Sequence, residues 1–180
     1  MLQVQYARGL HRITGLTLNK RFRLIKLMTR NLLTIELVPK TAWYKNVRSN
    51  VSTREWEKLK RITFGRAGHS CEICGGQGDR WPVECHEIFV YDDEHHIQKL
   101  VRLMALCPAC HEVKHIGLAG LRGKGNAAKA HLAKVNKWSI QDAELYIEAC
   151  FELWHRRSCH EWKLDLSYLE QFGIENNRLR

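Results

Sequence analysis

The chain has 180 residues, 44% of them apolar, and six tryptophans, which is enough to fold around a core and excludes wholesale disorder. Lys or Arg interrupts every hydrophobic stretch near the N-terminus, and no run approaches the ~18 apolar residues of a membrane helix, so no membrane partner is expected. The formal charge of +10 resides almost entirely in residues 1–50, which hold ten Lys or Arg and one acid.

The basic region is predicted to be an N-terminal extension, residues 1–48. Within it, residues 32–38 read Leu-Leu-Thr-Ile-Glu-Leu-Val and are predicted to form one strand that Pro39 ends. A basic arm of this kind neutralises phosphates and gives sequence-independent affinity for nucleic acid. A solvated tail, an organelle transit peptide or an extension upstream of a start at Met28 would show the same charge, so these alternatives stay open.

A helix is predicted to follow the extension. Ser52 is its expected N-cap, because Glu55 stands three residues later and completes a capping box. The residues expected to face a core, at helical spacing, are Trp56, Leu59 and Ile62. Gly68 is expected to end this helix just before the first pair of cysteines.

A β-hairpin arm is predicted over residues 81–91, followed by a polar turn at residues 92–96. The alternation of a strand places Cys85 and Glu87 on one side of this arm and His86 on the other. A helix is predicted to begin at Pro108, because proline suits the first turn. His111 and His115 are four residues apart and are expected on one face of this helix, which Gly117 and Gly120 end.

The C-terminal part is predicted to be mainly helical. One short helix is expected from residue 126 to about residue 135, and the longest runs from its cap at Ser139 to about residue 157. An alternating segment at residues 162–166 and a last turn from Ser167 follow. The basic turn at residues 122–125 either holds a phosphate at the following helix N-terminus or is a plain surface turn.

These elements predict one domain, residues 49–172, between the N-terminal extension and a tail of residues 173–180. Its core is expected at residues 68–120, where the cysteine pairs and the hairpin lie. Residues 121–160 are expected to form a helical brace around that core. A single domain of this size can bury a core.

Two Cys-x-x-Cys pairs, Cys71/Cys74 and Cys107/Cys110, are separated by thirty-two residues. Each pair supplies half of a tetrahedral site, so together they predict one closed structural zinc site. The chain has seven cysteines, an odd number, and four of them have this zinc-type spacing, which favours a reducing, cytoplasmic setting over a disulfide scaffold. The other three are expected to be small core residues: Cys85, Cys150 and Cys159.

A second set of potential ligands consists of His86, His111 and His115, which a purely structural zinc does not need. Histidines four residues apart beside a cysteine pair indicate a metal site. Alternatively, one of the two replaces a cysteine at the zinc or caps the helix, and His86 with Glu87 forms a hydrogen-bonded hairpin pair. The remaining histidines considered are expected at the surface: His95, His96, His155 and His160.

The two stretches resemble the HNH endonuclease family. The hairpin stretch reads Cys-His-Glu-Ile at residues 85–88, and the helix stretch reads Leu-Cys-Pro-Ala-Cys-His-Glu-Val-Lys-His at residues 106–115. The resemblance covers roughly residues 68–120. It implies an α+β fold in which a ββα-metal (treble-clef) zinc module is embedded in flanking helices.

The resemblance also implies roles for single residues. His86, His111 and His115 would hold one catalytic divalent ion, such as Mg²⁺, Mn²⁺, Ni²⁺ or Zn²⁺. Glu87 stands where the family has its general base, so His86, Glu87 and His111 would be the catalytic residues. In a second register, Cys85 takes the ligand position and His86 is the base. Arg102 stands where the family often has an asparagine.

The function implied by the resemblance is metal-dependent hydrolysis of phosphodiester bonds in DNA, which leaves 5′-phosphate ends. DNA would be the partner, held mainly through its backbone along the minor groove. The family also suggests a bacterial or phage origin. Two other functions stay open: a non-catalytic treble-clef zinc module that binds nucleic acid or a protein partner, and a nuclease directed at RNA.

Overall fold

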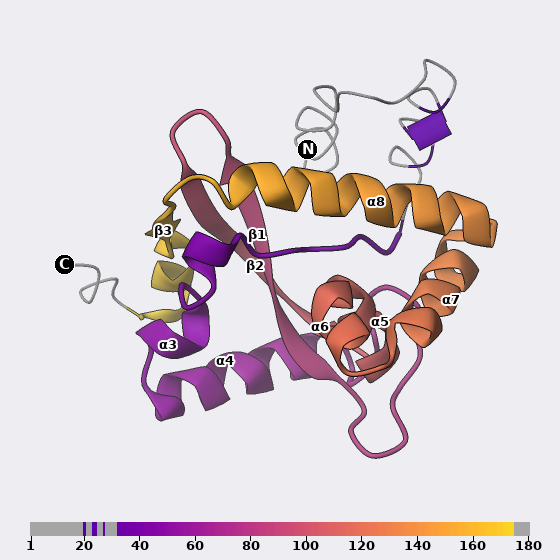
Figure 1. Ribbon diagram of the computed structural model, residues 1–180. Helices are drawn as coiled ribbons and strands as arrows, with labels where there is room; N and C mark the ends of the chain where they lie inside the picture. The colour runs from indigo at the N-terminus through magenta and orange to yellow at the C-terminus, as the bar shows by residue number, and fades with distance from the viewer. Residues whose placement is uncertain (1–19, 21–22, 25–26, 28–31, 175–180) are drawn as a thin grey trace. The chain divides into compact units, whose positions relative to one another are not determined.

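A computed structural model describes residues 20, 23–24, 27 and 32–174 of the chain. Helices and a three-stranded sheet occur together, so the fold is α+β (Figure 1). The chain divides into two compact units. The helical unit combines the described part of residues 1–38 with residues 109–157, and the sheet unit combines residues 39–108 with the described part of residues 158–180.

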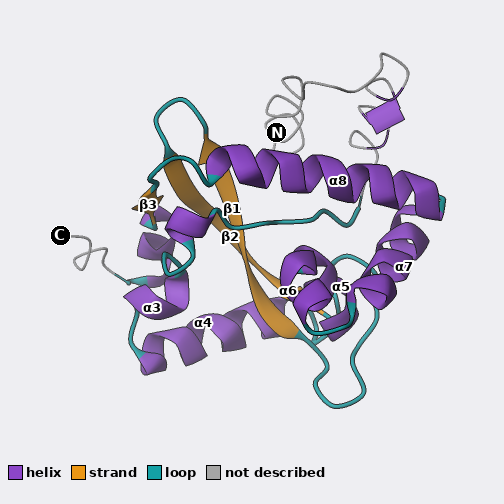
Figure 2. Cartoon of the chain, in the orientation of Figure 1, coloured by secondary structure: helices purple, strands orange, loops and turns teal. Residues whose placement is uncertain are grey.

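The sheet unit is built on strands in the order β1–β2–β3 (Figure 2). The strands are β1 (Glu84–Asp92), β2 (Ile97–Leu106) and β3 (Lys163–Asp165). β1 pairs antiparallel with β2, and β2 pairs parallel with β3. The predicted hairpin arm is confirmed, although its strand begins at Glu84 rather than at residue 81. The alternating segment at residues 162–166 contains β3.

The longest helix of the sheet unit, α4 (Thr53–Arg66), begins at the predicted capping box. The Ser52 hydroxyl accepts from the backbone N–H of Glu55 at 3.3 Å, and the Glu55 carboxylate accepts from the N–H of Ser52 at 2.7 Å. Leu59 is buried as predicted, whereas Ile62 is 38% exposed and does not face the core. The unit's short helical elements are η1 (Lys40–Ala42), α3 (Val47–Asn50) and η2 (Ser167–Phe172).

The helical unit contains α5 (Pro108–Lys114), α6 (Ile116–Leu121), α7 (Gly125–Asn136) and α8 (Ile140–Arg157). Of these, α7 and α8 are the two predicted C-terminal helices, and α6 was not predicted as a separate helix. Ser139 caps α8, because its hydroxyl accepts from the N–H of Asp142 at 3.1 Å. The helix predicted to run from Pro108 to Gly117 is broken, since His115 has non-helical torsion angles between α5 and α6. Its N–H still donates to the His111 carbonyl at 3.2 Å, so the turn carrying the two histidines is retained.

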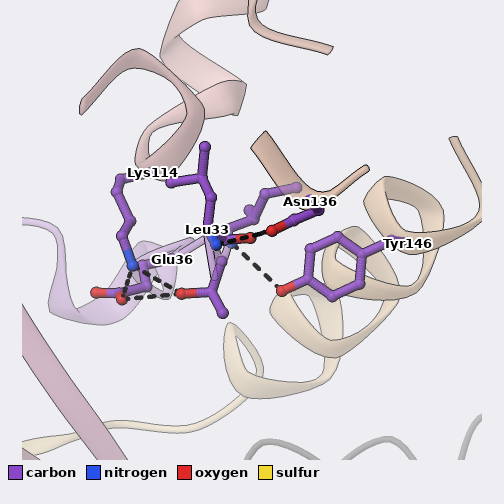
Figure 3. Close-up of polar contacts among 7 residues, drawn as sticks. Leu33, Glu36, Lys114, Asn136 and Tyr146 are labelled. Atoms are coloured by element: carbon purple, nitrogen blue, oxygen red, sulfur yellow. Dashed lines mark hydrogen bonds and ion pairs between the residues drawn. The ribbon is translucent and has the colours of Figure 1, made fainter. Parts of the chain in front are cut away.

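The strap, residues 32–38, is extended but is not a strand of the sheet. Side chains of α7 and α8 satisfy its backbone instead (Figure 3). Asn136 Oδ1 accepts from the N–H groups of Leu32 and Leu33, both at 2.9 Å, and the Tyr146 hydroxyl accepts from that of Ile35 at 3.3 Å. Leu33 and Ile35 are fully buried. Part of the predicted extension is therefore built into the helical unit.

A buried ion pair fixes the middle of the strap. The ammonium of Lys114 is 2.6 Å from the Glu36 carboxylate and 2.7 Å from the Thr34 hydroxyl (Figure 3). The Glu36 N–H also donates to the Lys114 carbonyl at 3.0 Å. The strap is thus joined to the end of α5 through both backbone and side chains.

Several predictions fall on residues outside the described part. One is the proposed start at Met28. Another is the basic arm before residue 32, of which the structure describes Lys20, Arg23, Leu24 and Leu27 alone. The tail is described only at its first two residues, where Gly173 ends η2 and Ile174 is buried. Within the described residues, no helix combines the length and apolar character needed to cross a membrane.

Candidate metal centre

The four predicted zinc ligands form one group. The Sγ atoms of Cys71, Cys74, Cys107 and Cys110 all lie within 4.8 Å of one another. Cys74 Sγ and Cys107 Sγ are 3.6 Å apart, far beyond a disulfide bond of about 2.05 Å. Tetrahedral zinc with bonds of about 2.3 Å to sulfur separates its ligand atoms by about 3.8 Å. The group can therefore hold a metal such as zinc, as the spacing predicted.

The first cysteine pair lies in a tight turn that its glycines make possible. Gly75 has φ +74°, a left-handed conformation that favours glycine, and its N–H donates to the Cys71 carbonyl at 2.9 Å. The Gly76 N–H points at Cys74 Sγ at 3.4 Å. At Gly78, a Cβ atom would come within 2.4 Å of the Trp81 carbonyl oxygen. The turn therefore favours glycine at position 75 for its conformation and leaves no room for a side chain at position 78.

Glu72, between the first two cysteines, fastens this turn to β2. Its backbone N–H donates to the Ala105 carbonyl, and its carboxylate accepts from the Ala105 N–H, both at 2.9 Å. The same carboxylate pairs with Arg102. Arg102, at the position where the family often has an asparagine, thus braces the first cysteine pair. No local pattern signals this role for Glu72, because its partners on β2 lie thirty or more residues away.

The three predicted histidines form a second group. One ring nitrogen each from His86, His111 and His115 lies within 4.8 Å of the other two. The rings of His111 and His115 are perpendicular, with centroids 4.7 Å apart. His86 is 3% exposed and lies on β1 opposite Met104. The group contains His86 and not Cys85 among the described residues, which is the arrangement of the first register.

Glu87 lies on the other face of β1 and does not join either group in the described part of the chain. Its carboxylate accepts from the Val47 N–H at 2.9 Å and so satisfies a donor at the start of α3. Burial raises the pKa of Glu87 to about 7, while hydrogen bonds from the backbone of Val47 and Arg48 oppose that rise. The structure therefore separates the expected base from the three histidines.

His131 is a neighbour of the thiolate group that the motif spacing does not predict. Its Nε2 atom lies 3.2 Å from Cys110 Sγ. A signal for it exists, because His131 interrupts the apolar face of α7 beside the buried residues Ala128 and Leu132. A histidine at the edge of such a face is expected to have a polar partner nearby, because buried polar groups are hydrogen-bonded.

The remaining candidate residues lie outside both donor groups in the described part of the chain. Cys150 is buried as predicted, and burial raises its pKa to about 12, but Cys159 is exposed and is not a core residue. Cys85 is half-buried, and burial raises its pKa to about 12 as well. In the basic turn at residues 122–125, Lys124 pairs with Glu112. Phosphate binding there stays a prediction.

Comparisons with known proteins found no family model, curated protein or solved structure that matches the chain. The similarity to HNH endonucleases accordingly depends on the motif residues alone. Any assignment of function therefore has to come from the chemistry of the two donor groups, one of four thiolates and one of three imidazoles.

Proposed function

We propose that the protein is a metal-dependent DNA endonuclease of the HNH type, with a treble-clef ββα-metal module. The observation that carries this proposal is the second donor group, made of imidazoles only and distinct from the thiolate group. Four thiolates saturate a structural zinc. Three further protein ligands leave coordination positions open, which a catalytic metal requires and a structural one does not.

The roles follow from the donor set. His86, His111 and His115 hold and orient a divalent ion through one ring nitrogen each. When bound, such an ion polarises a phosphate oxygen and stabilises charge on the departing 3′ oxygen. Hydrolysis adds water across the P–O3′ bond and leaves a 5′-phosphate and a 3′-hydroxyl. Imidazole ligands suit Ni²⁺ and Zn²⁺ better than Mg²⁺, which prefers oxygen, so we expect the former to support activity best.

The thiolate group supports the histidines through the chain itself. His111 follows Cys110 directly in α5, and His115 is joined to His111 by a backbone hydrogen bond of 3.2 Å. A filled zinc site fixes the first turn of α5 and with it the direction of both imidazoles. In this proposal, the zinc is a structural requirement of the catalytic group.

Glu87 needs a test of its own. The resemblance makes Glu87 the general base, but its carboxylate already accepts a hydrogen bond from the Val47 N–H. Glu87→Gln keeps an oxygen acceptor for the Val47 N–H but removes proton acceptance. If Glu87 is the base, this variant loses nicking activity by about 100-fold or more without loss of bound metal. If it only positions β1, the variant stays within a few-fold of wild type.

Nicking of supercoiled plasmid with Mg²⁺, Mn²⁺, Ni²⁺ or Zn²⁺ tests the whole proposal. His111→Ala should lower the rate by about 100-fold or more, because a ligand is lost. His95→Ala is the matched control, since His95 is exposed and outside the group. Wild type that nicks no faster than His111→Ala would exclude hydrolysis. A parallel single-stranded RNA substrate separates a DNA nuclease from one directed at RNA.

A second candidate is a non-catalytic treble-clef zinc module that binds nucleic acid or a protein partner. It is favoured by the two departures from the family pattern, Glu87 and Arg102, which both make structural contacts, with Val47 and Glu72. Metal content separates the candidates. One tightly held zinc per chain supports the binding module, and a second, weaker ion that His86→Ala loses supports the nuclease.

A further inference from the structure

We infer that His131 is a positioning residue of the zinc site, donating a hydrogen bond from Nε2–H to the thiolate of Cys110. The inference concerns the thiolate group and does not depend on nuclease activity. The two atoms are 3.2 Å apart, a normal distance for an N–H···S bond. Cys110 is fully buried, so water does not reach its sulfur. Donors to this sulfur therefore come from the protein, and His131 Nε2 lies within hydrogen-bond distance of it.

The hydrogen bond from His131 matters because the zinc site carries a net negative charge. Zinc with four thiolates carries a formal charge of −2, and a buried net charge is unfavourable unless hydrogen bonds stabilise it. The Gly76 N–H already points at Cys74 Sγ at 3.4 Å. His131 serves Cys110 from a different element, the 12-residue helix α7. Its donor role requires the proton on Nε2, which defines the tautomer.

His131 is better explained as a donor than as a ligand. A structural zinc site is closed at four ligands, and the thiolate group already supplies four. In a tetrahedral site, sulfur and nitrogen ligands are separated by about 3.6 Å, given zinc bonds of about 2.3 and 2.1 Å. The observed 3.2 Å is shorter and fits a hydrogen bond between the two groups.

The contact links the zinc to the strap through α7. Five residues beyond His131, Asn136 accepts from the N–H groups of Leu32 and Leu33 and donates to the Leu33 carbonyl at 2.8 Å. A helix transmits position over this short distance because its backbone bonds are continuous. Zinc binding therefore stabilises α7, and α7 in turn holds the strap.

The experiment compares His131→Gln and His131→Leu in the full chain. Gln places an amide N–H near the position of Nε2, whereas Leu has no donor. We expect His131→Leu to release zinc to a chromogenic chelator about 10-fold faster than wild type, and His131→Gln to stay within about two-fold. In the Co²⁺-substituted protein, the sulfur-to-cobalt charge-transfer band should shift in the Leu variant and be restored in the Gln variant. His95→Leu, at an exposed position, should match wild type.

Two results would overturn the inference. One is a Leu variant that matches wild type in both zinc release and the charge-transfer band. The other is a Gln variant as impaired as the Leu variant, which would indicate packing rather than donation. If the Leu variant fails to fold, long-range ¹H–¹⁵N spectra of the wild-type zinc protein still decide the question. A proton on Nε2 of His131 supports the inference, and a proton on Nδ1 alone contradicts it.

Discussion

Glu87 follows a predicted metal ligand on β1, yet its carboxylate accepts from the Val47 N–H at 2.9 Å. That bond satisfies a backbone donor at the start of α3. We expect Glu87→Ala to lower the free energy of unfolding by about 1 kcal/mol, the usual loss when a helix start loses its side-chain acceptor. Glu87→Gln should lower it by less, because an acceptor remains. Urea unfolding of both variants checks this, and equal losses would point to packing instead.

Asp92 and His95 form an exposed pair at the turn between β1 and β2, with Asp92 Oδ2 2.8 Å from the His95 Nδ1 atom. Hydrogen bonds from His95 lower the pKa of Asp92, and the hydrogen bond with Asp92 raises the pKa of His95. The ionic part of this pair stabilises the turn while Asp92 is ionised and His95 protonated, and the backbone N–H groups of Glu94 and His95 also donate to the Asp92 carboxylate. The ionic contribution is lost as pH rises through the raised pKa of His95, and the whole contribution of the carboxylate is lost as pH falls through the lowered pKa of Asp92.

An NMR titration of the histidines tests this pair. His95 should titrate above the ordinary value of about 6.5, and Asp92→Asn should return it towards that value because the charge is removed. The carboxamide keeps a hydrogen-bond acceptor, so the variant isolates the effect of charge. An unchanged titration of His95 in Asp92→Asn would show that the carboxylate does not act on it.

At the scale of elements, the strap depends on a buried ion pair. Lys114 is 3% exposed in its side chain and Glu36 11%, and their charged atoms are 2.6 Å apart. Lys114→Met removes the ammonium that lies 2.6 Å from the largely buried Glu36 carboxylate, so we expect a loss of about 3 kcal/mol in the free energy of unfolding. The double variant Lys114→Met/Glu36→Leu should recover much of it, because two apolar groups of similar size replace the pair. Chemical denaturation of the two single variants and the double variant measures the coupling.

The elements that sequence predicted best are those with local start signals. α4 and α8 begin at Ser52 and Ser139 as predicted, because a cap and its acidic partner lie within three residues. The strap was predicted as a strand, since its apolar and β-branched residues favour extended backbone. It is extended, but its hydrogen bonds go to Lys114, Asn136 and Tyr146, the nearest of them 78 residues from its partner in the strap. No local pattern could indicate those partners.

The same limit applies to the candidate site as a whole. Both donor groups were predicted because most of their members lie three or four residues apart, a spacing that local geometry brings together. The contacts that surround them join distant residues: Glu87 with Val47, and Cys110 with His131. Such contacts depend on how strands and helices pack, and packing is set by the entire chain rather than by a motif.

At the scale of the whole molecule, we expect metal binding at the histidine group to depend on the thiolate group, but not the reverse. His111 and His115 follow directly from the cysteine pair that ends in Cys110, and α5, which carries it, has only seven residues. So short a helix is not stable alone, and in the proposed site a zinc ion bound by Cys107 and Cys110 would fix its first turn. We expect Cys107→Ser to lose zinc and, with it, Ni²⁺ binding at the histidines. His86→Ala should lose Ni²⁺ binding while keeping one zinc per chain.

Metal analysis and Ni²⁺ titration calorimetry on these two variants separate the possibilities. If the groups were independent, Cys107→Ser would bind Ni²⁺ with wild-type affinity, and the proposed support of the histidines by zinc would be wrong. The asymmetry is physical: β1 holds His86 through its ladder with β2, which needs no metal, whereas in the described structure the backbone contact between the strap and the turn of His111 and His115 is the single bond from the Glu36 N–H to the Lys114 carbonyl. Loss of zinc should therefore leave His111 and His115 without a fixed position in the group. Two histidines on an unfolded turn do not replace an organised three-ligand site.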